Sequence, residues 1–258
     1  MKAYEISEIL ENKFPLHLAE SWDNVGFMLG RVDKEINKIL VSLDVTDFVV
    51  DEAIENNVDM IISHHPLIFT GLKKITTDTP EGRRLLHLIR NDITVYSAHT
   101  NLDCANGGIN DRLAQLFHLS DVKTINVNDY GCGLGRIGYL NDALTAEEFA
   151  NQACLILDTD VRLTGNMSKM VKCIAVASGA CDDIIPDSIK MGADLVLTGD
   201  CKYHRNLDFS ANDIVIIDAG HYPTEIICMD IFAQELVQYG INIIKSKEKD
   251  VFTYIRKD

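Results

Sequence analysis

Four segments of the sequence share one pattern: an apolar run, a small residue, and then side chains that can bind a metal ion or transfer a proton. They read MIISHHP, TVYSAHTNLD, LVLTGDCKYH and VIIDAGHYPTE. Five of the eight histidines lie in these segments, namely His64, His65, His99, His204 and His221. In open parallel sheets, ligands bind outside the carboxyl ends of the strands. The pattern therefore predicts one site assembled from strand ends that are distant in the sequence.

The candidate metal ligands are three imidazoles and two carboxylates, with no thiolate among them: His64, His65, Asp103, His221 and Glu225. Nitrogen and oxygen ligands of this kind suit zinc, iron(II) or manganese(II). Five ligands are too many for one closed tetrahedral ion, but they suit two ions that share a carboxylate and keep positions for water. The set predicts two divalent metal ions per chain and hydrolysis by an activated water.

His99 is the predicted catalytic residue, a proton relay beside the metal ions. It has two other interpretations, a hydrogen bond to the backbone or direct binding to a metal ion. Asp103 could instead cap the helix that follows it. Glu225 could be placed near a helix N-terminus for its charge alone, although His221 lies four residues earlier and would share its helix face.

The sequence leaves the roles of several further residues undecided. The GDCKYH segment contains Asp200, Lys202 and His204. A functional role and a solvated turn explain these residues equally well. The histidines within or beside helical patterns are expected to be structural: His17, His87 and His118. Trp22 is expected in packing, and the adjacent Asp23 and Asn24 could border the cleft.

Strand and helix patterns alternate along the chain, which is the βαβ signature of a doubly wound parallel sheet. Strands are expected at 25–30, 38–45, 58–63, 93–98, 135–140, 172–178, 194–200, 213–220, 241–246 and 251–256. Helices are expected at 3–13, 46–57, 81–92, within 106–119, and at 145–157, 182–192 and 224–240. Thr46 is a candidate N-cap, and Thr145 with Glu148 forms a capping-box pattern.

The glycine-rich stretch 128–138, NDYGCGLGRIG, is the expected junction between two domains. Its Gly-x-Gly pieces are a weak signal for a phosphate-binding loop, because a strand follows them rather than a helix. A connecting turn is the better interpretation.

Composition limits the possible functions. The chain has 258 residues, 47% of them apolar, which is enough for one large or two small domains. Its net charge of −15 argues against non-specific binding to nucleic acid or to an anionic membrane. The seven cysteines are scattered and form no C-x-x-C motif, as expected for reduced thiols in a cytoplasmic protein. Neither a signal peptide nor a membrane-spanning run is expected.

The segments ISHHPLIF, SAHTNLD, GDCKYH and DAGHYPTE, in this order and preceded by SWDNVG, resemble the Nif-three-like family of dinuclear metal-centre proteins. The family is also catalogued as GTP cyclohydrolase 1 type 2, and the resemblance runs from about Trp22 to Glu225. It implies that the five ligands named above hold two metal ions, and that His99 lies beside them.

The resemblance also implies a fold, an α/β architecture of two interlinked three-layer α/β/α domains with mostly parallel sheets and the metal site at their interface. The first domain would comprise residues 1–127 and about 226–258, and the second 128–225. The resemblance further implies assembly into a toroidal homohexamer. Longer family members carry an extra domain inserted mid-chain, and the short join at about 120–138 indicates that this chain is the compact version.

Two functions follow from the residues and the resemblance. The first is a metal-dependent hydrolase acting on a nucleotide or a related heterocycle, cyclohydrolase-like by the family name. The alternative is a non-catalytic metal-binding protein that stores, delivers or senses metal or regulates a partner. An enzyme requires an open metal position, a pocket and turnover, whereas a carrier shows exchangeable metal and no turnover.

Overall fold

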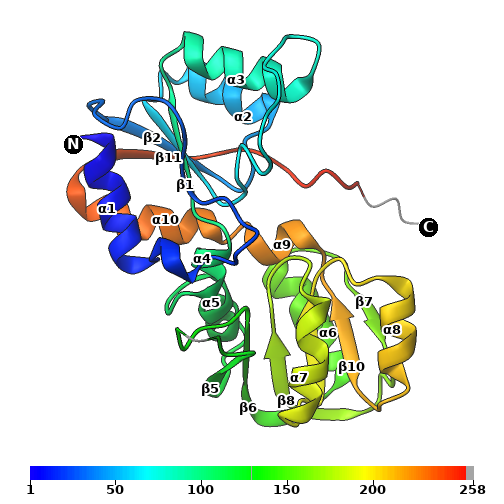
Figure 1. Ribbon diagram of the computed structural model, residues 1–258. Helices are drawn as coiled ribbons and strands as arrows, with labels where there is room; N and C mark the ends of the chain where they lie inside the picture. Colours follow the sequence, from blue (N-terminus) through cyan, green and yellow to red (C-terminus); the bar gives the residue numbers. More distant parts are fainter. Residues whose placement is uncertain (129, 254–258) are drawn as a thin grey trace. The chain divides into compact units, whose positions relative to one another are not determined.

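The computed structural model describes residues 1–128 and 130–253 (Figure 1). The chain forms two compact units, each built on its own β-sheet. Unit 1 comprises Met1–Asn12, Trp22–His99 and Cys228–Asp258, and unit 2 comprises Lys13–Ser21 and Thr100–Ile227. The domain boundaries predicted from the sequence lie at residue 128 and near residue 226. They concern parts of the chain that would fold independently, and they stay predictions.

The sheet of unit 1 is mostly parallel, as predicted. Within the described residues it has five strands in the order β1-β4-β3-β2-β11, and only the β1–β4 ladder is antiparallel. The strands are β1 (Gly26–Leu29), β2 (Lys38–Ser42), β3 (Met60–Ser63), β4 (Thr94–Ser97) and β11 (Asn242–Lys245). Every residue of β3 and β4 is buried, because the sheet is covered by helices on both sides.

The helices of unit 1 are α1 (Ala3–Lys13), α2 (Asp47–Glu55), α3 (Pro80–Arg90) and α10 (Cys228–Leu236), followed by the short 3₁₀ turn η3 (Val237–Tyr239). Thr46 caps α2 as predicted, and its side chain accepts a hydrogen bond from the N–H of Val49. Val49 packs in the apolar core with Leu40 of β2 and Leu85 of α3. The core thus fixes the strands whose carboxyl ends carry the candidate site.

The sheet of unit 2 is mixed rather than mostly parallel. Its six described strands follow the order β5-β6-β8-β9-β10-β7. They are β5 (Ser120–Ile125), β6 (Gly135–Thr145), β7 (Arg162–Thr164), β8 (Met170–Val176), β9 (Leu195–Thr198) and β10 (Val215–Asp218). Only β8–β9–β10 run parallel, because these strands are joined through crossover helices, whereas β5 returns directly into β6.

The helices of unit 2 cover both sides of this sheet. The α-helices are α4 (Thr100–Cys104), α5 (Ile109–Leu116), α6 (Ala146–Leu157), α7 (Ile185–Lys190), α8 (Tyr203–Ser210) and α9 (His221–Glu225), with 3₁₀ turns η1 (Leu16–Leu18) and η2 (Asp182–Ile184). The predicted capping box is present at the start of α6, where Thr145 and Glu148 satisfy each other's backbone N–H groups.

Several elements differ from the sequence prediction. Strands β5 and β7 and helices α4 and α8 were not predicted, and the predicted helix 224–240 is divided into α9 and α10 with a break at Ile226 and Ile227. The predicted strand 251–256 is wrong over 251–253, which have no strand structure, and the remainder lies outside the described residues.

The glycine-rich stretch forms the turn between β5 and β6, two neighbouring strands of one sheet, and thus a connection rather than a phosphate loop. A Cβ atom at Gly133 would lie 2.2 Å from the carbonyl oxygen of Ile125, so the close approach of these two backbone segments requires glycine there. Among the helices described, none has the length and apolar character needed to cross a membrane.

Candidate metal centre

One group of candidate ligands lies in unit 1, where β3 and β4 end side by side. Ser63 and Ser97 are register partners at the ends of these strands, and their hydroxyl oxygens are 2.8 Å apart. His64 follows Ser63 directly, and His99 follows Ser97 with only Ala98 between them. The parallel register therefore brings both histidines to the same edge of the sheet.

The adjacent His64 and His65 both contribute to this edge because the chain leaves regular strand geometry there. Their N–H groups donate to the consecutive carbonyls of Ser42 and Leu43, at 3.2 and 2.8 Å. Consecutive N–H groups of a regular strand point to opposite neighbours, so this pairing marks a turn. The two imidazole centroids lie 5.2 Å apart.

The imidazoles of His64, His65 and His99 are each held through Nδ1 by an oxygen. His64 Nδ1 lies 2.9 Å from the carbonyl oxygen of Ala98. His65 Nδ1 lies 2.9 Å from Oδ1 of Asp44, and His99 Nδ1 lies 2.8 Å from Oδ1 of Asp23. A carbonyl or carboxylate oxygen accepts, so each Nδ1 is the donor in its pair, and Nε2 is the nitrogen left to bind a metal ion.

The imidazoles of His64, His65 and His99 are close enough to bind one metal ion. The ring of His99 lies 5.1 Å from that of His64 and 5.5 Å from that of His65. One nitrogen from each of the three lies within 4.8 Å of the others, which is a spacing suited to binding a metal ion. His64 is fully buried, so a cation bound there would be shielded from solvent.

Another group of candidate ligands lies in unit 2, at the first turn of α9. The turn brings His221 and Glu225 onto one helix face, with Nε2 of the histidine 2.8 Å from Oε2 of the glutamate. His221 Nδ1 lies 3.0 Å from Oδ2 of Asp200, which repeats the anchoring pattern of unit 1. The segment GDCKYH thus contributes a partner of His221 through Asp200, whereas Lys202 and His204 are exposed at the start of α8.

Asp103 lies in α4 with only 6% of its surface exposed. Its Oδ1 accepts a hydrogen bond of 2.9 Å from the hydroxyl of Ser178, and the N-cap of the following helix, α5, is Gly108. One of its carboxylate oxygens lies within 4.8 Å of one from Glu225, which is itself 4% exposed. Two buried carboxylates at this spacing favour a cation between them.

Gly179 keeps space open beside these ligands. A Cβ atom built at this position would lie 2.0 Å from Oε1 of Glu225 and 3.3 Å from Nε2 of His221. The φ angle of Gly179 is +59°, a left-handed conformation that glycine adopts without strain. A larger residue would enter the space in which a metal ion would contact both side chains.

Thiols do not join this ligand set. Burial raises the pKa of the Cys181 thiol well above its usual value, and the nearby carboxylates of Asp103 and Glu225 raise it further. Burial likewise raises the pKa of Cys104, which follows Asp103 directly. Among the described residues, no cysteine belongs to the groups of side chains that could hold a metal ion, and these groups offer imidazole nitrogens and carboxylate oxygens.

All six residues predicted for the site belong to groups of histidine and acidic side chains that could hold a metal ion: His64, His65, His99, Asp103, His221 and Glu225. Sequence reasoning missed Asp44. It follows β2 by two residues, so the same strand-end rule that selected the other residues could have found it. Asp23 was placed only at the border of the cleft, whereas it binds His99 directly.

Comparison with known proteins assigns the family. The family model described as Duf34/NIF3 (NGG1p interacting factor 3) matches residues 1–251. The chain belongs to the DUF34/NIF3 family. The resemblance noted in the sequence is thereby confirmed.

Relatives in the family match along nearly the whole chain. A Clostridium perfringens protein named GTP cyclohydrolase 1 type 2 homolog is 38% identical over 99% of this chain and 100% of its own length. A Bacillus subtilis relative of the same name is 27% identical over an alignment of 366 positions, and so is longer than this chain.

Solved structures of NIF3-type proteins share the fold. A hypothetical protein from Staphylococcus aureus, 30% identical, superimposes with a TM-score of 0.93 and coverage of 99% for each chain. A Bacillus cereus protein related to NIF3, 25% identical, gives a TM-score of 0.92 with the same coverage.

Proposed function

We propose that the protein is a metal-dependent hydrolase acting on a nucleotide or a related heterocycle, with two divalent ions held by five residues: His64, His65, Asp103, His221 and Glu225. The observation that carries the proposal is the anchoring of every imidazole through Nδ1, because this pattern orients a histidine for metal binding through Nε2. When bound, zinc, iron(II) or manganese(II) would supply Lewis-acid activation of water.

His99 is the proposed catalytic residue. Its bond to Asp23 fixes the proton on Nδ1, so Nε2 is the atom that would take up and return a proton during hydrolysis. The Asp23 carboxylate would stabilise the positive charge that His99 gains in that step. Because His99 is only 5.1 Å from His64, ring centre to ring centre, direct metal binding is the competing role that the test must separate.

Two exposed aromatic rings support a heterocyclic substrate. Trp22 is 57% exposed and Phe69 is 49% exposed. Their ring centroids lie 5.9 Å from each other and 6.1 and 6.3 Å from that of His99, respectively. Exposed rings beside an ionisable side chain offer a stacking surface for a planar base. The names of the relatives, which refer to a GTP cyclohydrolase, point to the same chemical class.

A metal-reconstituted sample, screened against nucleotides and cyclic amides, tests the proposal. We expect turnover that disappears with chelator and returns with metal. His99→Ala should lower turnover by about two orders of magnitude or more, the usual contribution of a general acid or base, with metal content unchanged. Glu225→Gln should lower the metal content itself, and the exposed His204→Ala, a matched histidine control, should change neither quantity.

Other outcomes would redirect the proposal. Loss of metal in His99→Ala would assign His99 as a ligand. A fully loaded protein that turns over nothing in the screen would favour a role in metal storage, delivery or sensing. We also propose a homohexameric ring, from the family resemblance, and a cytoplasmic location, with which the seven free cysteines agree.

A further inference from the structure

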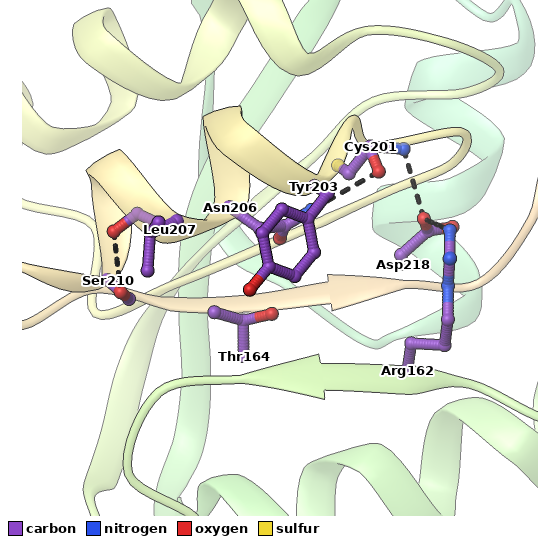
Figure 2. Close-up of a pocket in the computed structure, with 8 residues that line it drawn as sticks. All are labelled: Arg162, Thr164, Cys201, Tyr203, Asn206, Leu207, Ser210 and Asp218. Carbon is purple, nitrogen blue, oxygen red and sulfur yellow. Dashed lines mark hydrogen bonds and ion pairs between the residues drawn. The ribbon is translucent and has the colours of Figure 1, made fainter.

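A cavity of about 280 Å³ lies in unit 2 between α8 and the β7 edge of the sheet (Figure 2). It contains none of the proposed metal ligands. Its lining residues come from one helix, two strands and the turn before the helix: Arg162, Thr164, Cys201, Tyr203, Asn206, Leu207, Ser210 and Asp218. The volume is slightly below the range usual for drug-sized ligands, so it suits a smaller molecule.

One face of α8 forms a wall of the cavity. The lining positions 203, 206, 207 and 210 follow the i, i+3, i+4, i+7 spacing of a single helix face. A helix that packs fully on a sheet buries such a face, yet no residue of α8 is buried. Tyr203 and Leu207 remain 76% and 55% exposed. The Tyr203 ring projects from α8 toward the strand that carries Thr164, as Figure 2 shows, and so presents an uncovered flat surface.

The other end of the cavity carries a cation. Arg162 and Asp218 are register partners on the antiparallel β7–β10 pair, and Nη2 of Arg162 bonds to the buried Asp218 carboxylate. That carboxylate also accepts hydrogen bonds of 3.0 Å from the N–H groups of Cys201 and Gly220. Its negative charge is therefore well compensated within the protein.

Arg162 keeps hydrogen-bonding capacity for a ligand. Within the described part of the chain its hydrogen-bond partner is Asp218, through Nη2, so Nε and Nη1 still have N–H groups to donate. The side chain is 75% exposed. Burial raises the pKa of Cys201 to about 12, so the thiol in the lining stays neutral and does not repel an anion.

We propose that this cavity binds a small planar ring that bears one carboxylate. The carboxylate would accept the second N–H of Arg162 Nη2 and an N–H of the nitrogen that shares a guanidinium edge with it, Nε or Nη1, and the ring would stack on Tyr203 and contact Leu207. A phosphate dianion fits less well, because it would bring two charges to one guanidinium that already shares a carboxylate. Asn206 and Ser210 would bond to polar atoms on the ring.

Nicotinate is a suitable probe, and nicotinamide is its uncharged counterpart of nearly the same shape. The full chain is treated with EDTA before titration, so that bound metal cannot hold the carboxylate, and affinity is measured by NMR or calorimetry. We expect nicotinate to bind at least about tenfold more tightly than nicotinamide, as for one charge-assisted bidentate pair. Cyclohexanecarboxylate, which keeps the charge without a flat ring, should bind more weakly than nicotinate.

Variants assign the contacts. Arg162→Gln should weaken nicotinate binding about tenfold, and Tyr203→Ala should weaken both nicotinate and nicotinamide. Arg205→Gln is the matched control on the same helix and should bind normally, because Arg205 pairs with Asp183 and does not line the cavity.

The overturning results are specific. Equal affinity for nicotinate and nicotinamide, no measurable binding of nicotinate, or unchanged binding in a folded Arg162→Gln variant would each refute the proposal. If Arg162→Gln fails to fold, Arg162→Lys decides, because it keeps the charge but cannot form a bidentate pair and should bind nicotinate with intermediate affinity.

Discussion

Four imidazoles of the candidate site are held through Nδ1, and the oxygen that holds each comes from another part of the chain. Asp44 is 21 residues from His65, and Asp23 is 76 residues from His99. Such partners decide both the tautomer and the orientation of a ligating histidine. Their contribution can therefore be measured separately from that of the ligands.

Asp44→Asn is predicted to lower metal affinity by about 10- to 100-fold, the usual effect of removing the carboxylate partner of a metal-binding histidine. The amide makes a weaker partner for His65 Nδ1 than the carboxylate does. Competition with a chromogenic chelator measures the change. Asp33→Asn serves as control, because Asp33 is exposed and pairs with Arg31. Equal affinity in both variants would show that Asp44 does not support a metal ligand.

The candidate site could be predicted from the sequence as a set of residues but not as a geometry. Strand-end position selected His64, His65 and His221, and the structure places each of them in a group of side chains that could hold a metal ion. The pairing of His221 with Asp200 and the space kept by Gly179 depend on how separate loops meet. Neither leaves a periodic signal in the sequence, because each involves one residue per loop.

Among the elements, most of those with buried apolar faces were predictable and several exposed ones were not; the wholly buried α4 was missed because its sequence, TNLDC, is mostly polar. The apolar strands β3 and β9 are buried at every position, so their sequences mark them clearly. Strand β5 is exposed over its first four residues, and β7 has three residues at the sheet edge. Helix α8 buries no residue. Such short, exposed elements depend on their neighbours more than on burial of their own side chains, which is why their sequences did not mark them.

The capping box of α6 is an element whose sequence signal and structure agree. Thr145→Ala is predicted to lower the free energy of unfolding by about 1 kcal/mol, because the N–H of Glu148 loses its capping oxygen. Urea denaturation measures this loss. Thr145→Ser retains the hydroxyl and should be close to wild type. An alanine variant as stable as the serine variant would contradict the prediction.

The segment that follows β11 gives unit 1 a pH-dependent contact. The Glu248 carboxylate accepts N–H groups of Leu43 and Asp44, at 2.6 and 3.2 Å. Burial raises its pKa from the usual 4.5 to about 6, with the backbone hydrogen bonds and His65 opposing the shift. The folded state therefore binds this proton more tightly than the unfolded state does.

The sign of the pH effect follows from that difference. The contribution of Glu248 to stability is full below pH 4.5 and is lost as the pH rises through about 6. Glu248→Gln cannot titrate, so we expect a smaller fall in unfolding free energy between pH 4.5 and 7 than in wild type. Denaturation midpoints across this range measure it. Identical pH profiles would show that Glu248 has no raised pKa in the folded protein.

For the whole molecule, the proposed ring makes a prediction about mass. Light scattering after size exclusion should give about six times the chain mass of 28.8 kDa. The charge of −15 per chain makes salt concentration a necessary variable, because like charges on neighbouring subunits repel more strongly at low ionic strength. A stable monomer or dimer at all salt concentrations would contradict the hexamer.

The position of β11 has a consequence for the order in which the two units can fold during synthesis. This strand pairs with β2 at the edge of the first sheet, Asn242 opposite Lys38, although the larger segment of unit 2, Thr100–Ile227, separates them in the chain. A ribosome adding roughly 5–20 residues per second needs about 10 to 40 seconds to pass from one strand to the other. Throughout that interval the nascent chain leaves one edge of β2 without its final partner. Unit 2 can therefore fold first, while the sheet that carries His64 and His65 is completed last.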